Sequence, residues 1–344
     1  MANGEPILYS LYIYAPNKAA PIFFTIAYGI STIGHIWQCY HHKSWRLIGL
    51  HPLCGIIFTV GYALREYGAL DNYIYSEERK EQNLIPFVLS QVFIYVCPPL
   101  LELANYHVLG RIFYYMPYLA PLPPDRVLST FGGIMLIVEV LNGLGISLAS
   151  NPSSSGFQQT LGSGLTIAAL TLQLIVILIF VILAVLFHRR CRLAGLAPKA
   201  AMTPLWTLYV SMVLILIRCI YRTIEHSGHT AKDLDNIEVL RELTPILRYE
   251  WFFHVFEATL MLVNSVLWNI WSPGRFLPLS HCVYMGRDGR EKYVEEAPDD
   301  RTFGKKFLAV VTMGVLFRRK KGFQVIREGS EEAGEKMGSV ESRK

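Results

Sequence analysis

Seven mostly apolar stretches, each about 20 residues long, decide which solvent this chain can fold in. A helix of that length crosses the hydrocarbon core of a bilayer. Hydrophobic residues make up 52% of the 344 residues and charged residues only 17%, well below the charged content of soluble domains. The sequence therefore predicts an all-α, polytopic integral membrane protein with seven transmembrane helices. The predicted spans are 20–40, 47–70, 84–106, 128–150, 161–187, 204–224 and 249–271.

The distribution of lysine and arginine predicts how these spans are oriented, because cytosolic loops are enriched in both. Basic residues gather after the first, third and fifth spans, whereas the loop at 151–160 has none. We therefore expect an extracytosolic N-terminal tail over 1–19, a seven-helix membrane domain over 20–274 and a cytosolic tail over 275–344. The plasma membrane is the expected location, with other endomembranes as alternatives.

The predicted cytosolic tail is largely polar, and its last part has a disordered composition. Residues 307–321 differ, because a short apolar run there is followed by a basic cluster. This segment is too short to span a bilayer. It either lies on an anionic leaflet or forms a short packed helix.

Several function classes are excluded by what the sequence lacks. No basic run is interleaved with aromatic residues, so nucleic acid is not an expected partner. The 6 cysteines include no closely spaced pair, which argues against a disulfide framework and a zinc finger. No phosphate-binding loop of the Walker type is present, so ATP is not the expected direct energy source. We predict no cofactor and leave the oligomeric state open.

The last two predicted spans carry charged residues at helical spacing. Arg218, Arg222 and Glu225 share one face of the sixth span, because seven residues complete nearly two helical turns. An arginine at the centre of a membrane helix costs about 2.5–3.5 kcal/mol, so two of them need partners or water. The seventh span has a complementary face. Its residues are Glu250, His254 and Glu257.

The rise along two antiparallel helices predicts how these faces meet. Arg218 is expected level with Glu257, and Arg222 level with His254 or Glu250. One interpretation is a polar cavity, open toward the outer leaflet, that accepts the head group of an amphipathic ligand. The other is a structural ion-pair lock between the helices, and the two are compatible.

Polar residues in three other spans extend the predicted cavity. Glu102, Asn105 and Tyr106 form one stripe in the third span. Arg65 lies near the outer end of the second span, and Glu139 lies in the fourth. Four histidines at the cytosolic ends of the first two spans, His35, His41, His42 and His51, are instead predicted to be interfacial. The predicted cavity comprises Arg65, Glu102, Tyr106, Glu139, Arg218, Tyr221, Arg222, Glu225, Glu250, His254 and Glu257.

Three blocks of sequence resemble the fungal lipid-translocating exporter family, RTA-like seven-helix proteins linked to aminocholesterol resistance and sphingoid-base export. The resemblance covers roughly 14–274 and implies a lipid-related role. The blocks are Gly61-Tyr62-x-x-Arg65; Pro98, Tyr106, Gly110 and Arg111; and Arg218-x-x-Tyr221-Arg222-x-x-Glu225-x-x-Gly228, followed by Glu250-Trp251, Phe256-Glu257 and Met261.

The chain departs from the family pattern at several positions. Phe58 stands where the family has a glutamate, and Met135 stands where it has an aspartate, although Glu139 lies one turn further on. His254 replaces a tyrosine of the last motif. The resemblance therefore implies the fold more directly than the identity of the ligand, and His254 is where we expect this protein to differ from its relatives.

We expect a membrane protein that transports or exports lipids or amphipathic toxic compounds and so gives resistance to them. Its expected partners are membrane lipids or amphipathic small molecules, and no enzymatic activity is predicted. One alternative is a seven-helix receptor or sensor of lipid or membrane stress. A second is an intramembrane lipid hydrolase, for which His226, His229 and His254 would supply metal ligands.

Overall fold

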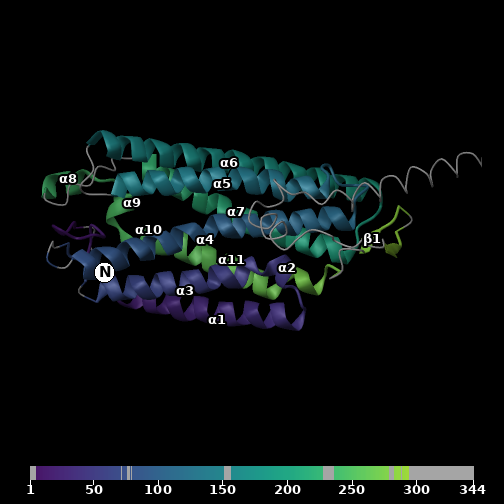
Figure 1. Cartoon of the computed structure of the whole chain (residues 1–344), viewed down its shortest axis with the longest axis horizontal. Coiled ribbons are helices and arrows are strands. Elements are labelled where there is room, and N and C mark those ends of the chain that lie inside the picture. The colour runs from purple at the N-terminus through teal and green to yellow at the C-terminus, as the bar shows by residue number, and fades with distance from the viewer. Residues whose placement is uncertain are drawn as a thin grey trace, which may run out of the picture.

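The computed structural model describes residues 5–70, 72–75, 78, 80–150, 156–227, 236–278, 283–287 and 289–293. Long helices run back and forth along one axis and form a single bundle (Figure 1). The predicted tail segment at 307–321 and the end of the chain lie outside the described residues. The long helices are α1 (Ala19–His41), α3 (Leu50–Ala69), α4 (Lys80–Tyr115), α5 (Pro124–Ser150), α6 (Gly156–Leu193) and α7 (Lys199–Ser227).

The final pass through the bundle is built from three consecutive helical segments. These are α10 (Glu250–Phe253), the π-helix η2 (His254–Thr259) and α11 (Leu260–Ile270). Helices α5 and α6 lie side by side along one edge of the bundle, and α1 and α3 along the opposite edge (Figure 1). Between them, α4 contacts α3, α5 and α7, and α11 contacts α1 and α7. The last pass therefore closes the bundle against its first helix.

The chain is an all-α polytopic membrane protein. Within the described ranges, 6 helices are long and apolar enough to cross a membrane. The second predicted span corresponds to α3, which has the length but is not among these helices. Its apolar character is interrupted by His51, Arg65 and Glu66. The count of seven spans and the orientation of the termini stay predictions.

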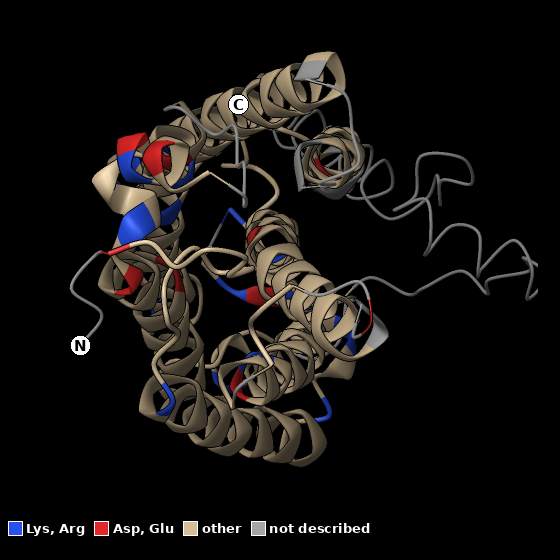
Figure 2. Cartoon of the chain, turned by 90° about the vertical axis from the view of Figure 1, so that its left-hand side faces the viewer, with Lys and Arg blue, Asp and Glu red and all other residues tan. Residues whose placement is uncertain are grey.

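The outer surface of the bundle is mostly apolar, and charged side chains are buried in its interior, as expected for helices in lipid. On α1, for example, Phe23, Ile26, Ile30 and Ile33 are all exposed. Seen from one end, most of the helical ribbon carries no acidic or basic residue (Figure 2). Such a surface would be unusual on a soluble monomer, which agrees with a bilayer as the solvent.

Small residues bring neighbouring helices close together. A Cβ atom added to Gly55 on α3 would lie 2.2 Å from the Thr32 hydroxyl oxygen on α1. No real side chain tolerates that approach, so this crossing depends on glycine. Thr32 donates its hydroxyl to the Tyr28 carbonyl within its own helix at 2.7 Å, which keeps the crossing apolar.

The two ends of the bundle are covered by short elements. At one end lie α8 (Ile237–Glu242), α9 (Pro245–Arg248) and the N-terminal segment 5–18, which pairs with 72–75 through the Ser10–Ile74 bridge (Figure 1). At the other end lie α2 (Trp45–Ile48), η3 (Pro273–Arg275) and an antiparallel hairpin of β1 (Val283–Met285) and β2 (Glu291–Tyr293). The first part of the predicted cytosolic tail is thus folded against the bundle, where Tyr115 donates to Glu291 at 2.8 Å.

Candidate functional site

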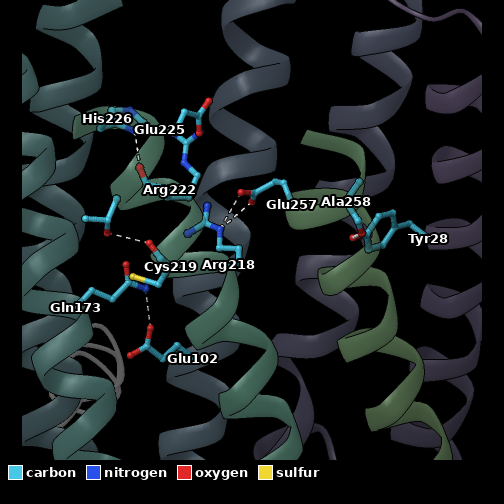
Figure 3. A network of polar contacts seen from close by, with 11 residues as sticks. Tyr28, Glu102, Gln173, Arg218, Cys219, Arg222, Glu225, His226, Glu257 and Ala258 are labelled. Carbon is cyan, nitrogen blue, oxygen red and sulfur yellow. Dashed lines mark hydrogen bonds and ion pairs between the residues drawn. The ribbon is translucent and has the colours of Figure 1, made fainter. Parts of the chain in front are cut away.

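An ion pair between α7 and the π-helix lies at the centre of the polar interior (Figure 3). The Nε atom of Arg218 donates to both carboxylate oxygens of Glu257, at 3.0 and 2.9 Å. Arg218 is 2% exposed and Glu257 is completely buried. This pairing confirms the register predicted from helix rise. Each charge stabilises the other where water does not reach it.

The π-helix that carries Glu257 widens the helix by one residue in each turn, and such segments are frequent at functional sites. Two of its carbonyl groups accept hydrogen bonds from side-chain hydroxyls. Tyr28 of α1 donates to the Ala258 carbonyl at 2.9 Å, and Thr259 donates to the His254 carbonyl at 2.8 Å. One hydrogen bond from α1 and one from the π-helix's own threonine thus stabilise the wide turn.

Arg65 of α3 forms a second buried ion pair at the end of the bundle that carries α8 and α9. Its Nη2 atom lies 3.1 Å from Glu250 Oε1 and donates to the Tyr14 hydroxyl at 3.1 Å. The guanidinium also lies over the rings of Tyr12 and Phe253, at 4.8 and 4.2 Å from their centroids. A cation enclosed by aromatic faces is stabilised without water.

The N-terminal segment completes this second cluster. The Asn17 backbone N–H donates to Glu250 Oε2 at 2.7 Å, and the Asn17 side chain accepts from the N–H of Ala19 at the start of α1. Burial raises the pKa of the Tyr14 hydroxyl, so it stays neutral and accepts the hydrogen bond from Arg65. Residues predicted to form a simple extracytosolic tail therefore cover one end of the polar interior.

His254 belongs to this cluster and contacts the same oxygen of Glu250 as Arg65 does. Its Nε2 atom lies 3.2 Å from Glu250 Oε1, and its ring stacks on Phe24 of α1 with centroids 5.7 Å apart. The prediction that Arg222 lies level with His254 or Glu250 is wrong. Glu250 pairs with Arg65, and His254 contacts Glu250 and Phe24.

Arg222 instead pairs within its own helix. Its Nη1 atom lies 2.5 Å from Glu225 Oε2 (Figure 3). Its guanidinium lies over the Tyr95 ring of α4, 3.9 Å from the centroid. An acidic residue three positions further along α7 was already within reach of Arg222, so no residue of the final pass was needed. The nearby Tyr221 is buried and stacks on Phe256 of the π-helix at 5.5 Å.

Glu102 on α4 contributes another buried carboxyl group to the site. Glu102 is completely buried and accepts a hydrogen bond from the Tyr106 hydroxyl. It accepts a second from Gln173 Nε2 of α6 at 2.7 Å (Figure 3). Glu139 on α5 is half-buried and within electrostatic range of Arg218. Its Oε1 atom is buried without a hydrogen-bond partner among the described residues. The predicted residues thus take part in separate contacts, and the single cavity that they were expected to line stays a prediction.

Two histidines that sequence reasoning assigned to the interface are buried instead. His35 and His51 are 1% and 2% exposed, and their rings stack 5.4 Å apart. His35 Nε2 lies 3.2 Å from Ser265 Oγ, whereas both ring nitrogens of His51 lack a partner among the described residues. The prediction of interfacial positions is wrong for this pair, because α11 packs against α1 and brings Ser265 to His35 and Trp268 to His51. No local sequence signal marks this difference.

Below the central ion pair, amide groups continue the polar interior along α11. Asn264 is completely buried, and neither of its amide atoms has a partner in the described part of the chain. Asn105 of α4 and Trp268 of α11 both donate to Ser211 of α7, at 2.8 and 3.1 Å. Sequence reasoning placed Asn105 in the polar stripe of the third span but missed Asn264, Ser211 and Trp268, because single amides and serines occur widely in membrane helices.

The metal-site alternative finds no support in the described residues, where no group of three histidine, cysteine, aspartate or glutamate side chains could hold an ion. His226 lies at the end of α7, with Nδ1 3.0 Å from the Arg222 carbonyl, whereas His254 contacts Glu250. His229 lies outside the described residues.

Comparison with known proteins shows which family this chain is similar to. The family described as RTA1-like protein matches residues 52–280, which include every ion pair of the buried interior. The chain belongs to the RTA1-like family. None of the solved structures matches the chain.

Three relatives are similar to most of this chain. The lipid-translocating exporter-like protein RTA1 of Leptosphaeria maculans is 50% identical, over 93% of this chain and 62% of the relative. A protein of the same name from Ajellomyces capsulatus is 29% identical, over 77% and 84%. The probable lipid transporter atnI of Emericella nidulans is 24% identical, over 78% and 68%. The chain thus spans less than two thirds of the Leptosphaeria relative.

Proposed function

We propose that this protein transports or exports lipids or amphipathic toxic compounds and thereby gives resistance to them, without catalysing a reaction. The observation that carries the proposal is the buried Arg218–Glu257 pair at the centre of a membrane bundle. Intramembrane charges are expensive and usually mark a pathway for a polar group. The names of the Leptosphaeria, Ajellomyces and Emericella relatives support a lipid as the cargo.

The pairing suggests how a head group could enter. A cationic amine would replace Arg218 as the partner of Glu257, and an anionic group would replace Glu257 as the partner of Arg218. In either case the contacted charge exchanges its partner, and the displaced residue needs another one to avoid the penalty of an isolated ion in lipid. Glu102 and Glu139 are within electrostatic range of Arg218, and Arg222 is within electrostatic range of Glu257. The acyl chain would stay among the apolar outer faces of the helices.

Access to this centre would be controlled at the end that the N-terminal segment covers. Arg65, Glu250 and Tyr14 connect three parts of the chain there and leave the pair at Glu257 enclosed. We propose that separation of these groups opens the cavity toward the outer leaflet. The lipid gradient or a proton would drive movement, and Glu102, Glu139 and His254 are the groups available to carry protons. The plasma membrane is the proposed location.

Transport by purified protein in lipid vesicles tests this proposal. Vesicles carrying fluorescent sphingoid bases or phospholipids should show faster exchange between leaflets with the wild-type protein than without it. Arg218→Ala and Glu257→Ala should each reduce the rate at least tenfold, and Glu257→Gln tests the charge alone at nearly constant shape. Arg241→Gln is the matched control, because its pair with Glu5 is 3.9 Å long and exposed. Unchanged exchange in the Arg218 and Glu257 variants would remove the proposed site.

A further inference from the structure

A groove on the lipid-facing surface lies between the end of α6 and the start of α7, away from the buried ion pairs. Its volume is about 680 Å³. Helix α6 contributes Val185, His188, Arg189 and Arg192, and α7 contributes Trp206 and Tyr209. The groove lies at the bundle end that carries the β1–β2 hairpin (Figure 1). From the positive-inside prediction, that end is the cytosolic one.

The charge of this groove is strongly one-sided. Arg189 and Arg192 are exposed, and neither forms an ion pair with any described residue. The sequence has no aspartate or glutamate between 140 and 224, so the neighbouring parts of α6 and α7 offer no acidic partner. Two guanidinium groups without a counter-charge favour an anionic ligand with several acceptor oxygens.

The lining of the groove also includes aromatic rings, one of which carries a buried hydroxyl group. His188 stacks on Tyr209 with centroids 6.1 Å apart and meets Trp206 edge-on at 5.5 Å. The Tyr209 hydroxyl is buried, and no described residue is within hydrogen-bond reach of it. Aromatic residues with one polar atom are typical of the level where head groups begin.

The rim of the groove is suited to acyl chains. Val185 and Trp206 are 50% and 59% exposed on the outer surface of the bundle, where lipid is the solvent. A soluble anion would gain nothing from these side chains, whereas a phospholipid would place its chains along them. Basic pockets between membrane helices on the cytosolic side are known places for anionic head groups.

We propose that this groove binds the head group of an anionic phospholipid such as phosphatidylserine, as a site separate from the transport pathway. Arg189 and Arg192 hold the phosphate and carboxylate oxygens, and Tyr209 donates to the same head group. The acyl chains lie along Val185 and Trp206. The bound lipid joins the ends of α6 and α7 and so stabilises the bundle at its predicted cytosolic end.

Binding to the purified full-length protein tests this site. Native mass spectrometry in detergent should show retention of phosphatidylserine but not of phosphatidylcholine with the same acyl chains. A basic residue near anionic lipid contributes about 1 kcal/mol, so Arg189→Gln and Arg192→Gln should each weaken retention about fivefold and together about 30-fold. Tyr209→Phe should weaken it several-fold.

Arg190→Gln supplies the matched control. This substitution removes the same charge from the same helical turn. The Arg190 guanidinium, however, donates to the Ala120 carbonyl at 3.3 Å, and Arg190 does not line the groove. Its retention of phosphatidylserine should equal that of the wild type. Equal loss in Arg190→Gln, or equal retention of phosphatidylcholine by the wild type, would overturn the proposal.

A second measurement distinguishes a lipid site from a simple anion site. Phosphatidylserine should raise the thermal unfolding temperature of the wild type, and glycerophosphoserine, which has no acyl chains, should not. The Arg189→Gln/Arg192→Gln protein should unfold at the same temperature with and without phosphatidylserine. A shift caused equally by glycerophosphoserine would contradict the assignment to a lipid.

Discussion

At the scale of single residues, charge pairs explain how this bundle tolerates buried arginines. Arg65, Arg218 and Arg222 each have a carboxylate within ion-pair distance. Removing one partner leaves the other as an isolated charge, whereas replacing both can be neutral or favourable. This asymmetry separates the structural contribution of a pair from its role in transport.

The Arg218–Glu257 pair gives the first residue-scale prediction. Arg218→Met should destabilise the protein by about 3–5 kcal/mol, because Glu257 is left buried and unpaired. Adding Glu257→Leu should restore most of that loss while transport stays abolished. Thermal unfolding in detergent measures the first effect and the vesicle assay the second. A double variant as unstable as the single one would contradict the pairing.

The buried pair of His35 and His51 gives a second prediction, in which a substitution raises stability instead of lowering it. His51→Phe keeps a ring that can stack on His35 and Trp268, and it removes two nitrogens that lack a partner among the described residues. It should raise the unfolding temperature, because a buried polar group without a hydrogen bond is destabilising. His35→Phe is the control, since it loses the contact with Ser265. A lower unfolding temperature for His51→Phe would show that its nitrogens are satisfied.

At the scale of elements, the antiparallel packing of α7 and the final pass brings Arg218 against Glu257. The sequence was sufficient to predict that Arg218 meets Glu257, because only the antiparallel direction and helix rise were needed. It was not sufficient for Arg222, because a nearer carboxylate at Glu225 competes. The Arg65–Glu250 pair could not be predicted either, since it depends on how α3 packs against the last pass.

The hydroxyl of Tyr28 should matter to the π-helix, whereas that of Tyr62 should not. Tyr28→Phe removes the hydrogen bond to the Ala258 carbonyl and should lower stability by about 0.5–1.5 kcal/mol. It should also slow transport, because the position of Glu257 depends on the wide turn. Tyr62→Phe on α3 is matched in size and burial, and its hydroxyl lacks a partner in the described residues. Equal effects of the two changes would contradict this account.

At the scale of the whole molecule, apolar patterning predicted an all-α membrane bundle, and the structure confirms it. Length and hydropathy alone did not reveal that residues 5–18 fold over one end and that β1 and β2 cover the other. Residues 5–18 are too few to span a bilayer and residues 283–293 are largely polar, so both segments resemble tails in sequence. They are ordered by contacts with distant parts of the chain, such as Asn17 with Glu250 and Tyr115 with Glu291.

The orientation of the chain in the membrane gives the prediction for the whole molecule. The described cysteines are all buried, so an introduced exposed cysteine can be labelled above a low background. An impermeant maleimide added to intact cells should label Glu5→Cys and not Lys199→Cys, because the N-terminus is predicted outside. After permeabilisation both should react. Labelling of Lys199→Cys alone in intact cells would reverse the predicted orientation.

The central claim is that Glu257 and Arg218 meet the head group of the transported lipid, and charge selectivity tests it most directly. The measurement is the ratio of exchange rates for a cationic sphingoid base and an anionic phospholipid in vesicles containing wild-type or Glu257→Gln protein. We predict that Glu257→Gln slows the cationic lipid at least tenfold more than the anionic one, because only the cation needs the carboxylate. Equal slowing of both lipids would show that the pair only holds the bundle together.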